Sequence, residues 1–327
     1  MSLSVVEEGF RNAPIIVTGA AGFIGSHLVE HLVALGAQVT AVDNLQAGSW
    51  ANLQAVSEQV VFTECDVRDA DAIGALVEKV QPSYVFHLAA NASVPGSVQD
   101  PVYDFEANCV GTFRLLNALR GQEACRKVVV ASSGAVYGQP DAFPITEESP
   151  LHPISPYGAS KLNTEITAQM MYRVYQVPIV IARLFNAYGP RMARFVVLDF
   201  LKKLQRNPHH LEVLGTGKQI RDFTYVADTV QGLITLALKG DCGVAYNISS
   251  GKNCSVTELA EAILAARGLS GKTHIEYTGT SWVGDAQRWE VSIERLKALG
   301  YRPRYSLEEG LRETIAWFDA TYGPAAI

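Results

Sequence analysis

Three residues of this chain have the types and spacing of a site that moves a hydride and a proton. Tyr157 and Lys161 are four residues apart, so on a helix they share a face, and an ammonium beneath the phenol would favour its ionised form. A phenol that ordinarily titrates near pH ~10 could then act as a base at neutral pH. Ser133 stands 24 positions before Tyr157, at the end of an apolar run. Because the chain holds 13 tyrosines, the pair alone is weak evidence, and its surroundings decide.

A glycine-rich turn near the start of the chain predicts a dinucleotide site. Gly19, Gly22 and Gly25 follow a first apolar run and lead into a helical pattern. Glycines let the chain turn tightly and approach a pyrophosphate, which sits at the positive end of the next helix. Asp43 closes the next expected strand, 18 residues after Gly25, where a carboxylate accepts hydrogen bonds from ribose hydroxyls and repels a 2′-phosphate. With no arginine at the two following positions, the pattern predicts NAD rather than NADP.

Asp66, at the end of the third expected strand, has two interpretations. It stands at the height where the adenine of a dinucleotide would lie. Alternatively, it caps the helix that is expected to begin near Ala70, because aspartate is a favoured N-cap residue.

Short apolar runs alternate with helical segments and predict the elements that carry these residues. The expected strands span residues 15–18, 39–43, 60–65, 84–88, 127–131 and 179–184. Strands that alternate with helices imply crossover connections, and runs that are apolar throughout suit parallel strands covered on both faces. The sequence therefore predicts an α/β fold with a doubly wound parallel sheet of the Rossmann type.

The regular alternation weakens after about residue 186, which indicates a second, smaller C-terminal lobe that binds substrate. We expect a tail over 1–13, an NAD-binding Rossmann domain over 14–186 with contributions from about 225–250, and the substrate lobe mainly over 187–327. A further strand is expected over 244–248, and a helix over 256–266 with Ser255 as its cap.

Composition excludes several classes of function. The 327 residues are 48% hydrophobic and 18% charged, which allows a sizeable core. A formal charge of −6 without a basic run argues against nucleic-acid binding. Five scattered cysteines without a Cys-x-x-Cys pair are typical of reduced thiols, and no metal site is expected. The first residues lack a long apolar core, so we expect no signal peptide or membrane anchor and a cytoplasmic protein.

Further motifs, in order along the chain, make it similar to a known family. They are His87-Leu88-Ala89-Ala90, Asn108-x-x-Gly111-Thr112, Ser132-Ser133-Gly134-Ala135-Val136-Tyr137-Gly138, Ser155 to Lys161, Arg183 to Arg191 and Arg221 to Val226. With the glycine turn and the three residues described first, they resemble the extended short-chain dehydrogenase/reductase family, and within it the NAD-dependent nucleotide-sugar epimerases and dehydratases. The resemblance covers nearly the whole chain.

This resemblance implies a role for each matched residue. Tyr157 would take the proton from a sugar hydroxyl as NAD⁺ removes the hydride, Lys161 would bind the nicotinamide ribose, and Ser133 would steady the sugar oxygen. Asn108 would either contact the cofactor or hold the loop after the fourth strand. The residues expected at the cofactor are Gly19, Gly22, Phe23, Ile24, Gly25, Asp43, Asn44, Asp66, Val67, Leu88, Ala89, Ala90, Asn108, Tyr157, Lys161 and Phe185.

The resemblance also implies a nucleotide-diphosphate site. Asn186, Arg221 and Arg288 are similar to positions that hold it in this family, and a guanidinium binds phosphate in a bidentate way. For Arg288, a surface ion pair is the alternative. The family often has arginine-proline before Gly-Asp, but here Trp-Val precedes the glycine and Asp285. Ser292 stands where the family often has an aspartate. These two departures leave open the detailed contacts between this segment and the nucleotide.

Gly134 and Ala135, directly after Ser133, bear on the choice of reaction. Dehydratases and decarboxylases of this family resemble one another in placing an acid there, and neither glycine nor alanine can move a proton. Return of the hydride to the opposite face, which epimerises the sugar at C4, is the outcome we expect. Glu147 and Glu148 are expected in solvent. The alternatives are a dehydratase, a sugar reductase or dehydrogenase, and a non-catalytic dinucleotide-sensing module.

Specificity and assembly give two further expectations. Trp289 occupies the place where sugar 4-epimerases of the family carry the residue that limits the size of the substituent at the sugar's C2. A large side chain there favours an unacetylated hexose or hexuronic acid. The alternative is that Trp289 is simply a core residue. UDP is the family's commonest nucleotide. The helices expected over 101–120 and 157–174 are those through which the family commonly forms homodimers, as a four-helix bundle.

Overall fold

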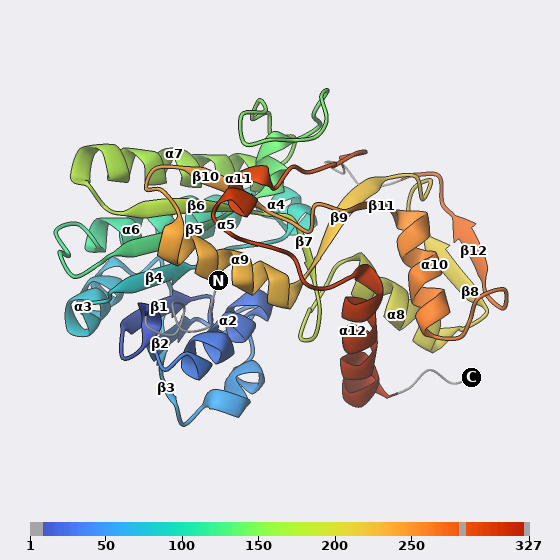
Figure 1. Cartoon of the computed structure of the whole chain (residues 1–327), viewed down its shortest axis with the longest axis horizontal. Coiled ribbons are helices and arrows are strands. Elements are labelled where there is room, and N and C mark those ends of the chain that lie inside the picture. The colour runs from blue at the N-terminus through green and yellow to red at the C-terminus, as the bar shows by residue number, and fades with distance from the viewer. Residues whose placement is uncertain (1–8, 281–285, 324–327) are drawn as a thin grey trace.

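A seven-stranded parallel sheet forms the centre of the computed structural model, which describes residues 9–280 and 286–323 (Figure 1). The strand order is β10-β6-β5-β4-β1-β2-β3. The strands are β1 Pro14–Thr18, β2 Gln38–Asp43, β3 Val60–Glu64, β4 Tyr84–His87, β5 Lys127–Ser133, β6 Ile179–Leu184 and β10 Ala245–Ile248. The doubly wound α/β fold is thereby confirmed, and each predicted strand is present, the fifth extending through Ser133.

Helices cover both faces of this sheet and explain why its strands are apolar throughout. The helices α3 (Ala70–Val80), α6 (Gly111–Ala118) and α7 (Pro156–Tyr175) lie on one face, and α2 (Phe23–Ala34) and α9 (Val226–Lys239) on the other. Successive side chains of a strand point to opposite faces. In β5, Val128 and Val130 therefore pack in the core beneath α7, whereas Val129 packs in the core shared with α2 and α9.

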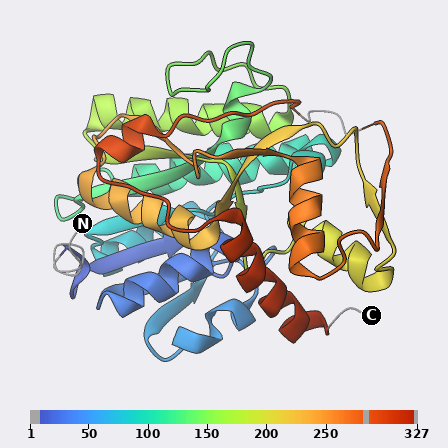
Figure 2. The same cartoon turned by 45° about the vertical axis from the view of Figure 1, so that its right-hand side comes forward.

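The smaller lobe has its own sheets and core (Figures 1 and 2). Its strands form a three-stranded sheet, β11-β9-β7, and a two-stranded parallel sheet, β12-β8. The elements are β7 Asn186–Tyr188, α8 Val196–Arg206, β8 His210–Val213, β9 Ile220–Tyr225, β11 Asn253–Ser255, α10 Val256–Ala266, β12 His274–Tyr277 and α12 Leu307–Tyr322. Ser255 caps α10 as predicted, in a capping box with Glu258.

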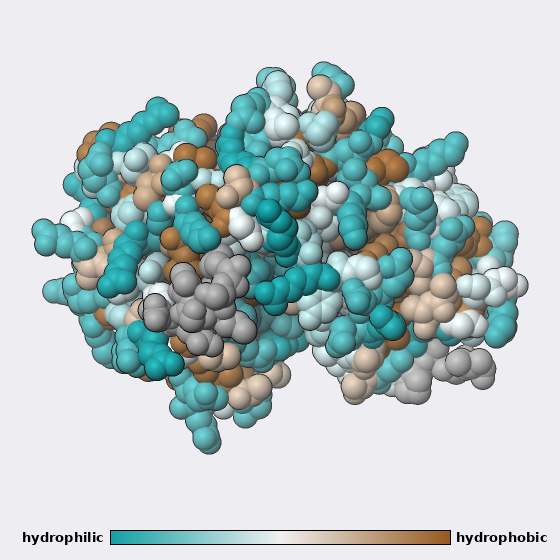
Figure 3. Space-filling view, in the orientation of Figure 1, coloured by the Kyte–Doolittle hydropathy of each residue, from teal (hydrophilic) through white to brown (hydrophobic). Residues whose placement is uncertain are grey.

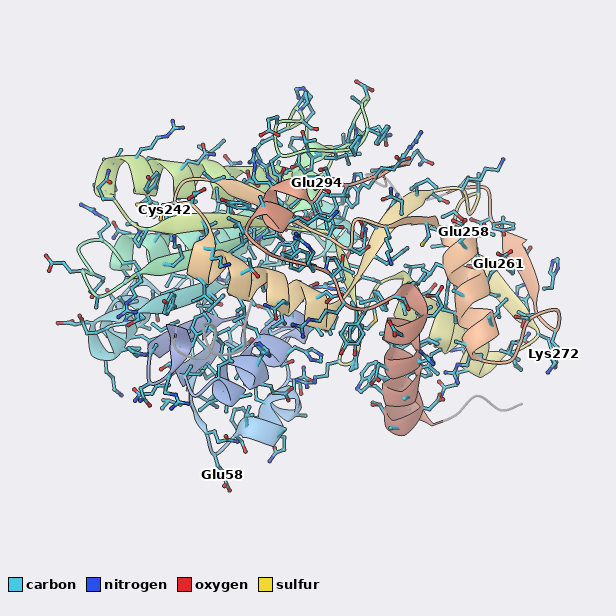
Figure 4. All side chains as sticks on the ribbon, viewed as in Figure 1. Glu58, Cys242, Glu258, Glu261, Lys272 and Glu294 are labelled. Carbon is cyan, nitrogen blue, oxygen red and sulfur yellow. The ribbon has the colours of Figure 1, made fainter. Side chains whose placement is uncertain are left out.

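The chain passes between the main sheet and this lobe more than once. After β9, the chain returns to the main sheet as α9 and β10, and after β12 it returns again as α11 (Glu294–Ala298), which contacts β10. In Figure 4, Glu294 of α11 accordingly lies beside the main sheet, whereas Glu258 and Glu261 lie on α10 and Lys272 follows it.

The surface in view is mostly hydrophilic, with apolar residues in small groups (Figure 3). Within the two described ranges, no helix is both long and apolar enough to cross a membrane.

A buried ion pair ties α7 to the sheet. Arg183 of β6 donates from Nε and Nη2 to the two carboxylate oxygens of Glu165 in α7, at 2.9 and 2.7 Å. The exposed fractions of the two side chains are 4% and 2%. Arg183 also donates from Nη1 to the phenol oxygen of Tyr137, at 2.7 Å. Desolvating two charges is costly, so the pair is stable only because both partners are present and hydrogen-bonded.

Replacing Glu165 by alanine should therefore destabilise the fold strongly. We expect Glu165→Ala to lower the free energy of unfolding by about 3–5 kcal/mol, because it leaves the Arg183 charge buried without its partner. Glu30→Ala is the control, since it removes the partly exposed pair with Arg191 and should cost about 1 kcal/mol or less. Chemical denaturation measures both, and equal losses would contradict the prediction.

Candidate active site

The residues predicted for the site gather at the carboxyl ends of the parallel strands. The glycine turn follows β1, Asp43 ends β2, Leu88 follows β4, Ser133 ends β5 and Phe185 follows β6. These ends meet at one edge of the sheet, where open α/β sheets bind their ligands.

The glycine turn has no room for side chains at Gly19 and Gly25. Gly19 has a φ of +69°, and a Cβ added there would lie 2.7 Å from the amide nitrogen of Ala89. A Cβ added at Gly25 would lie 2.0 Å from the carbonyl oxygen of Gly19. Helix α2 begins at Phe23 and directs its first backbone N–H groups to this turn. The turn therefore fits the pyrophosphate of a dinucleotide.

Asp43 links this turn to the expected ribose position. Its carboxylate accepts hydrogen bonds from the backbone nitrogens of Ala21 and Leu45, at 2.9 and 2.8 Å. Burial raises the pKa of Asp43, and these two donors oppose the shift. Because a carboxylate offers about four acceptor positions, it keeps capacity for the ribose hydroxyls.

At the adenine end, the alternative interpretation of Asp66 as a helix cap is wrong. The cap of α3 is Asp69, whose side chain accepts two backbone N–H groups of the first turn. Asp66 instead accepts hydrogen bonds from Arg68 and from the side chain of Asn44, at 2.9 Å. The Arg68 hydrogen bonds lower the pKa of Asp66 to about 2, so it is an anion at neutral pH.

Asn108 holds the loop that follows β4. It lies in a π-helical turn, Glu106–Val110, and is 1% exposed. Its amide oxygen accepts from the backbone nitrogen of Asn91 at 2.8 Å, and its amide nitrogen donates to the Ser160 hydroxyl at 2.9 Å. Of the two roles expected for Asn108, the structure favours the supporting one, because its hydrogen-bonding groups are used within the protein.

Helix α7 brings Tyr157 and Lys161 to the end of β5. Ser155 caps the helix, and the backbone nitrogen of Tyr157 donates to Ser97 of α4 (Val94–Gln99) at 3.0 Å. The Lys161 ammonium donates to the backbone carbonyl of Ala131 at 2.7 Å. Because a buried ammonium must be hydrogen-bonded, this carbonyl fixes its position.

The electrostatics of Tyr157 differ from the sequence-based expectation. Burial raises the pKa of the Tyr157 phenol, a hydrogen bond with Ser133 lowers it, Asp104 raises it, and Arg194 lowers it. The cation that acts on the phenol in this arrangement is therefore Arg194, whereas Lys161 is directed at Ala131. Burial lowers the pKa of Lys161 to about 8, opposed chiefly by Asp104.

Trp289 packs between the side chains of Arg221 and Phe185. The Arg221 guanidinium lies 5.3 Å from the centre of the Trp289 ring, which suits a cation–π interaction. Trp289 meets the Phe185 ring edge-on, with centroids 5.7 Å apart, and its Nε1 donates to the carbonyl of Gly138 at 3.2 Å. Trp289 thus contacts both the expected phosphate-binding arginine and the expected nicotinamide neighbour, and it also packs against the main core, so both interpretations of it stand.

The other expected substrate residues have mixed outcomes. The Asn186 amide donates to the backbone carbonyl of Asp222, at 3.3 Å. Arg288 forms an ion pair with Glu290 on the surface, which is the alternative that the sequence left open for it. Asp285 and the preceding Trp-Val-Gly lie outside the described residues.

Glu147 is buried, so the prediction that it is solvated is wrong. Its side chain is 3% exposed and accepts a hydrogen bond from the backbone nitrogen of Asn247 at 2.9 Å. That amide belongs to β10, at the edge of the sheet, and needs an acceptor once it is buried. Glu148 is 69% exposed, as expected.

Sequence reasoning missed several charged residues around the site. Asp104 is 1% exposed, and its carboxylate accepts a hydrogen bond from the Ser160 hydroxyl at 2.6 Å. Glu165 lies four residues after Lys161, and this helical spacing is a signal that could have placed it on the buried face of α7. No comparable pattern marks Asp104 or Arg194.

Comparisons with known proteins agree with this site. A family model described as GDP-mannose 4,6 dehydratase matches residues 16–314. The chain is 35% identical to a putative UDP-glucose 4-epimerase of Methanocaldococcus jannaschii over 311 residues, which cover 93% of this chain and 97% of that protein.

Two solved structures have the same fold. The UDP-glucose 4-epimerase of Thermotoga maritima, solved with UDP-glucose, has a TM-score of 0.87 and 34% identity, covering 94% of this chain and 99% of its own. A dTDP-glucose 4,6-dehydratase of Streptomyces venezuelae, solved with NAD, has a TM-score of 0.86 and 30% identity, covering 94% and 98%. The chain therefore belongs to the NAD-dependent nucleotide-sugar epimerases and dehydratases of the extended short-chain dehydrogenase/reductase family. NAD is its cofactor, as predicted.

Filling the glycine turn should abolish NAD binding. We expect Gly25→Ala to lose bound NAD and to be less stable than the parent by a few kcal/mol, because its Cβ would overlap the Gly19 carbonyl. Gly74→Ala in α3 is the matched control, since nothing lies within 4 Å of the added methyl group. It should keep NAD and gain up to about 1 kcal/mol. Absorbance of the cofactor released from denatured protein measures NAD content, and full NAD in Gly25→Ala would refute the assignment.

Proposed function

We propose that this protein epimerises a nucleotide-linked hexose or hexuronic acid at C4, through a transient 4-keto sugar. The observation that supports epimerisation most is the environment of Gly134. A Cβ added at Gly134 would lie 2.5 Å from the Phe185 ring. An acid at this position, which the family's dehydratases use, would have to displace that ring.

The chain's own side chains supply the proton chemistry. Tyr157 exchanges a proton with the C4 hydroxyl, and Ser133 hydrogen-bonds the same sugar oxygen. The Ser133 oxygen accepts from the backbone nitrogen of Ala135 at 3.2 Å, which leaves its hydroxyl proton free to be donated. When bound, NAD supplies the acceptor and then the donor of the hydride. A site without a further acid returns the sugar with only its C4 configuration changed.

The smaller lobe, mainly residues 187–327, is proposed to hold the nucleotide. Arg221 is 8% exposed and stacked on Trp289, so its guanidinium is fixed before a diphosphate arrives. Asn186 lies on the neighbouring strand, and UDP is the nucleotide we expect. The Trp289 ring takes up space beside Phe185, which supports an unacetylated sugar.

A panel of nucleotide sugars tests the reaction. The purified protein, without added cofactor, should interconvert a gluco/galacto pair and leave N-acetylated pairs nearly unchanged. NMR of the anomeric and C4 protons follows the products. A persistent keto-deoxy sugar would identify a dehydratase, a pentose a decarboxylase, and stoichiometric NADH release a dehydrogenase.

Tyr157→Phe should lower kcat by a factor of about 10² or more, because it removes the proton-exchanging hydroxyl. Tyr175→Phe is the control, as this tyrosine ends the same helix and is 40% exposed. Unchanged turnover in Tyr157→Phe would refute the proposed chemistry, and turnover by no pair in the panel would refute the proposed class of substrate.

We also propose that the protein is a homodimer through α5, α6 and α7. Large apolar side chains are exposed on these helices, including Val102 (67%) of α5 (Pro101–Phe105), Phe113 (45%) and Ile166 (57%). Exposed apolar groups on adjacent helices are typical of an interface between subunits.

A charge in this surface should weaken the dimer. We expect light scattering to give a dimer for the parent protein and a lower mass for Val102→Asp, because dimerisation would bury the carboxylate. Val61→Asp on β3 is the matched control, since Val61 is 62% exposed and lies on the edge strand away from these helices. A monomeric parent protein would contradict the proposal.

A further inference from the structure

Three consecutive residues of β5 are held by three residues of α7. The Lys161 ammonium donates to the carbonyl of Ala131 at 2.7 Å, and the Ser132 hydroxyl donates to the Glu165 carboxylate at 2.5 Å. Ser133, the third of these residues, lies close enough to Tyr157 to lower the pKa of the phenol. The three α7 residues are spaced four apart, so they form one face of the helix. This face therefore fixes both the rotation of the end of β5 and its position along α7.

The side chains of Ser132 and Ser133 point in different directions. Fixing the Ser132 side chain therefore also fixes the direction of the Ser133 side chain. Side chains alternate along a strand, and Ser132 is buried, at 2% exposure, on the side that faces α7. Ser133 is partly exposed and ends the strand. With the Ser132 side chain fixed to α7, the Ser133 hydroxyl is directed toward the open edge of the sheet, where Tyr157 lies.

Glu165 is a rigid anchor for Ser132. Both of its oxygens accept from Arg183, and Arg183 in turn donates to Tyr137 and to the backbone carbonyl of Glu147. Since every partner is buried or is backbone, the Glu165 carboxylate cannot turn away without leaving an unpaired charge.

We propose that Ser132 and Glu165 are positioning residues, which hold the Ser133 hydroxyl against Tyr157 in the geometry that proton exchange requires. They touch neither sugar nor cofactor, and they act through Ser133. This inference rests on the proposed function, in which Ser133 and Tyr157 share one sugar oxygen.

The proposal makes the titration of Tyr157 sensitive to Ser132. The groups that act on the phenol are Asp104 from α5, Arg194 from the loop before α8 and Ser133 from β5, whereas Lys161, on its own helix, donates to the Ala131 carbonyl. Removing the Ser132 hydroxyl leaves those charges unchanged but lets Ser133 move. Because Ser133 lowers the pKa of Tyr157, its displacement raises that pKa further, and since burial already puts the pKa above the ordinary ~10, the ionised phenol becomes scarcer by a similar factor at pH 7 and at pH 9.

The test compares Ser132→Ala, Ser132→Thr and Thr314→Val in the NAD-loaded protein. Ser132→Ala should lower kcat about tenfold or more, by a similar factor at pH 7 and at pH 9, with an unchanged KM, since misplaced catalytic groups cost rate. Ser132→Thr keeps the hydroxyl and should restore most of the rate. Thr314→Val, the control, removes a fully buried hydroxyl that donates to Gly310 in α12, at 2.7 Å, and should keep the parent rate. Equal rates for Ser132→Ala and the parent at both pH values would overturn the proposal, as would an equal loss in the control.

A second readout needs no substrate. The Tyr157 titration is obtained from the ultraviolet difference between each protein and the same protein carrying Tyr157→Phe, and Ser132→Ala should move it to higher pH. If no nucleotide sugar is turned over while this shift is seen, the proposed function fails and the positioning role stands. If the titration does not move, the positioning role fails, whatever the substrate is.

Discussion

The buried pairing of Arg183 with Glu165 is the interaction on which the site depends. It joins β6 to α7, and through Ser132 and Tyr137 it reaches β5 and the turn that follows it. A helix packed on a sheet by apolar contacts alone can slide, because such contacts have little direction. A bidentate ion pair in a desolvated place has a fixed geometry, so α7 and the sheet meet in one register. The candidate catalytic side chains of α7 are placed against β5 by that register.

The elements of the fold could be read from the sequence because their signals are local. Apolar runs mark the strands, glycines mark the first turn, and Ser255 with Glu258 marks the start of α10. The environment of Glu147 could not be read in this way, because its partner Asn247 is 100 residues away and the two meet only once β10 joins the sheet. The sequence cannot distinguish Asp66 from Asp69 as the cap of α3 for a related reason, since either aspartate suits an N-cap and only the observed backbone shows that Asp69 is the cap.

For the site itself, sequence patterns identified residues better than they identified interactions. The spacing of Tyr157 and Lys161 placed both residues on one helix, but it did not reveal that the ammonium turns to the Ala131 carbonyl. Competition among several buried acceptors decides that question, and the chain order does not encode it. Trp289 illustrates the same limit, since its contacts with Arg221 and Phe185 bring together three distant segments.

Phe185 connects the chemistry to the choice of product. If the first step of the proposed reaction is common to epimerases and dehydratases, selection must act on what the keto sugar can do next. The Phe185 ring lies where a side chain at position 134 would extend, because a Cβ added there would be 2.5 Å from the ring. In the proposed epimerase, product identity would then be controlled by shape as well as by the chemical nature of the neighbouring residues.

The repeated passage of the chain between the two parts of the molecule has a consequence for protein engineering. Segments 186–225 and 253–277 belong to the smaller lobe, yet α9 and β10 of the main sheet lie between them in sequence, and α11 returns to that sheet before α12 leaves it. No single cut of the polypeptide separates one part from the other. A chimera that exchanges the smaller lobe with that of a relative would need several crossover points, each at a loop where both parents have the same length.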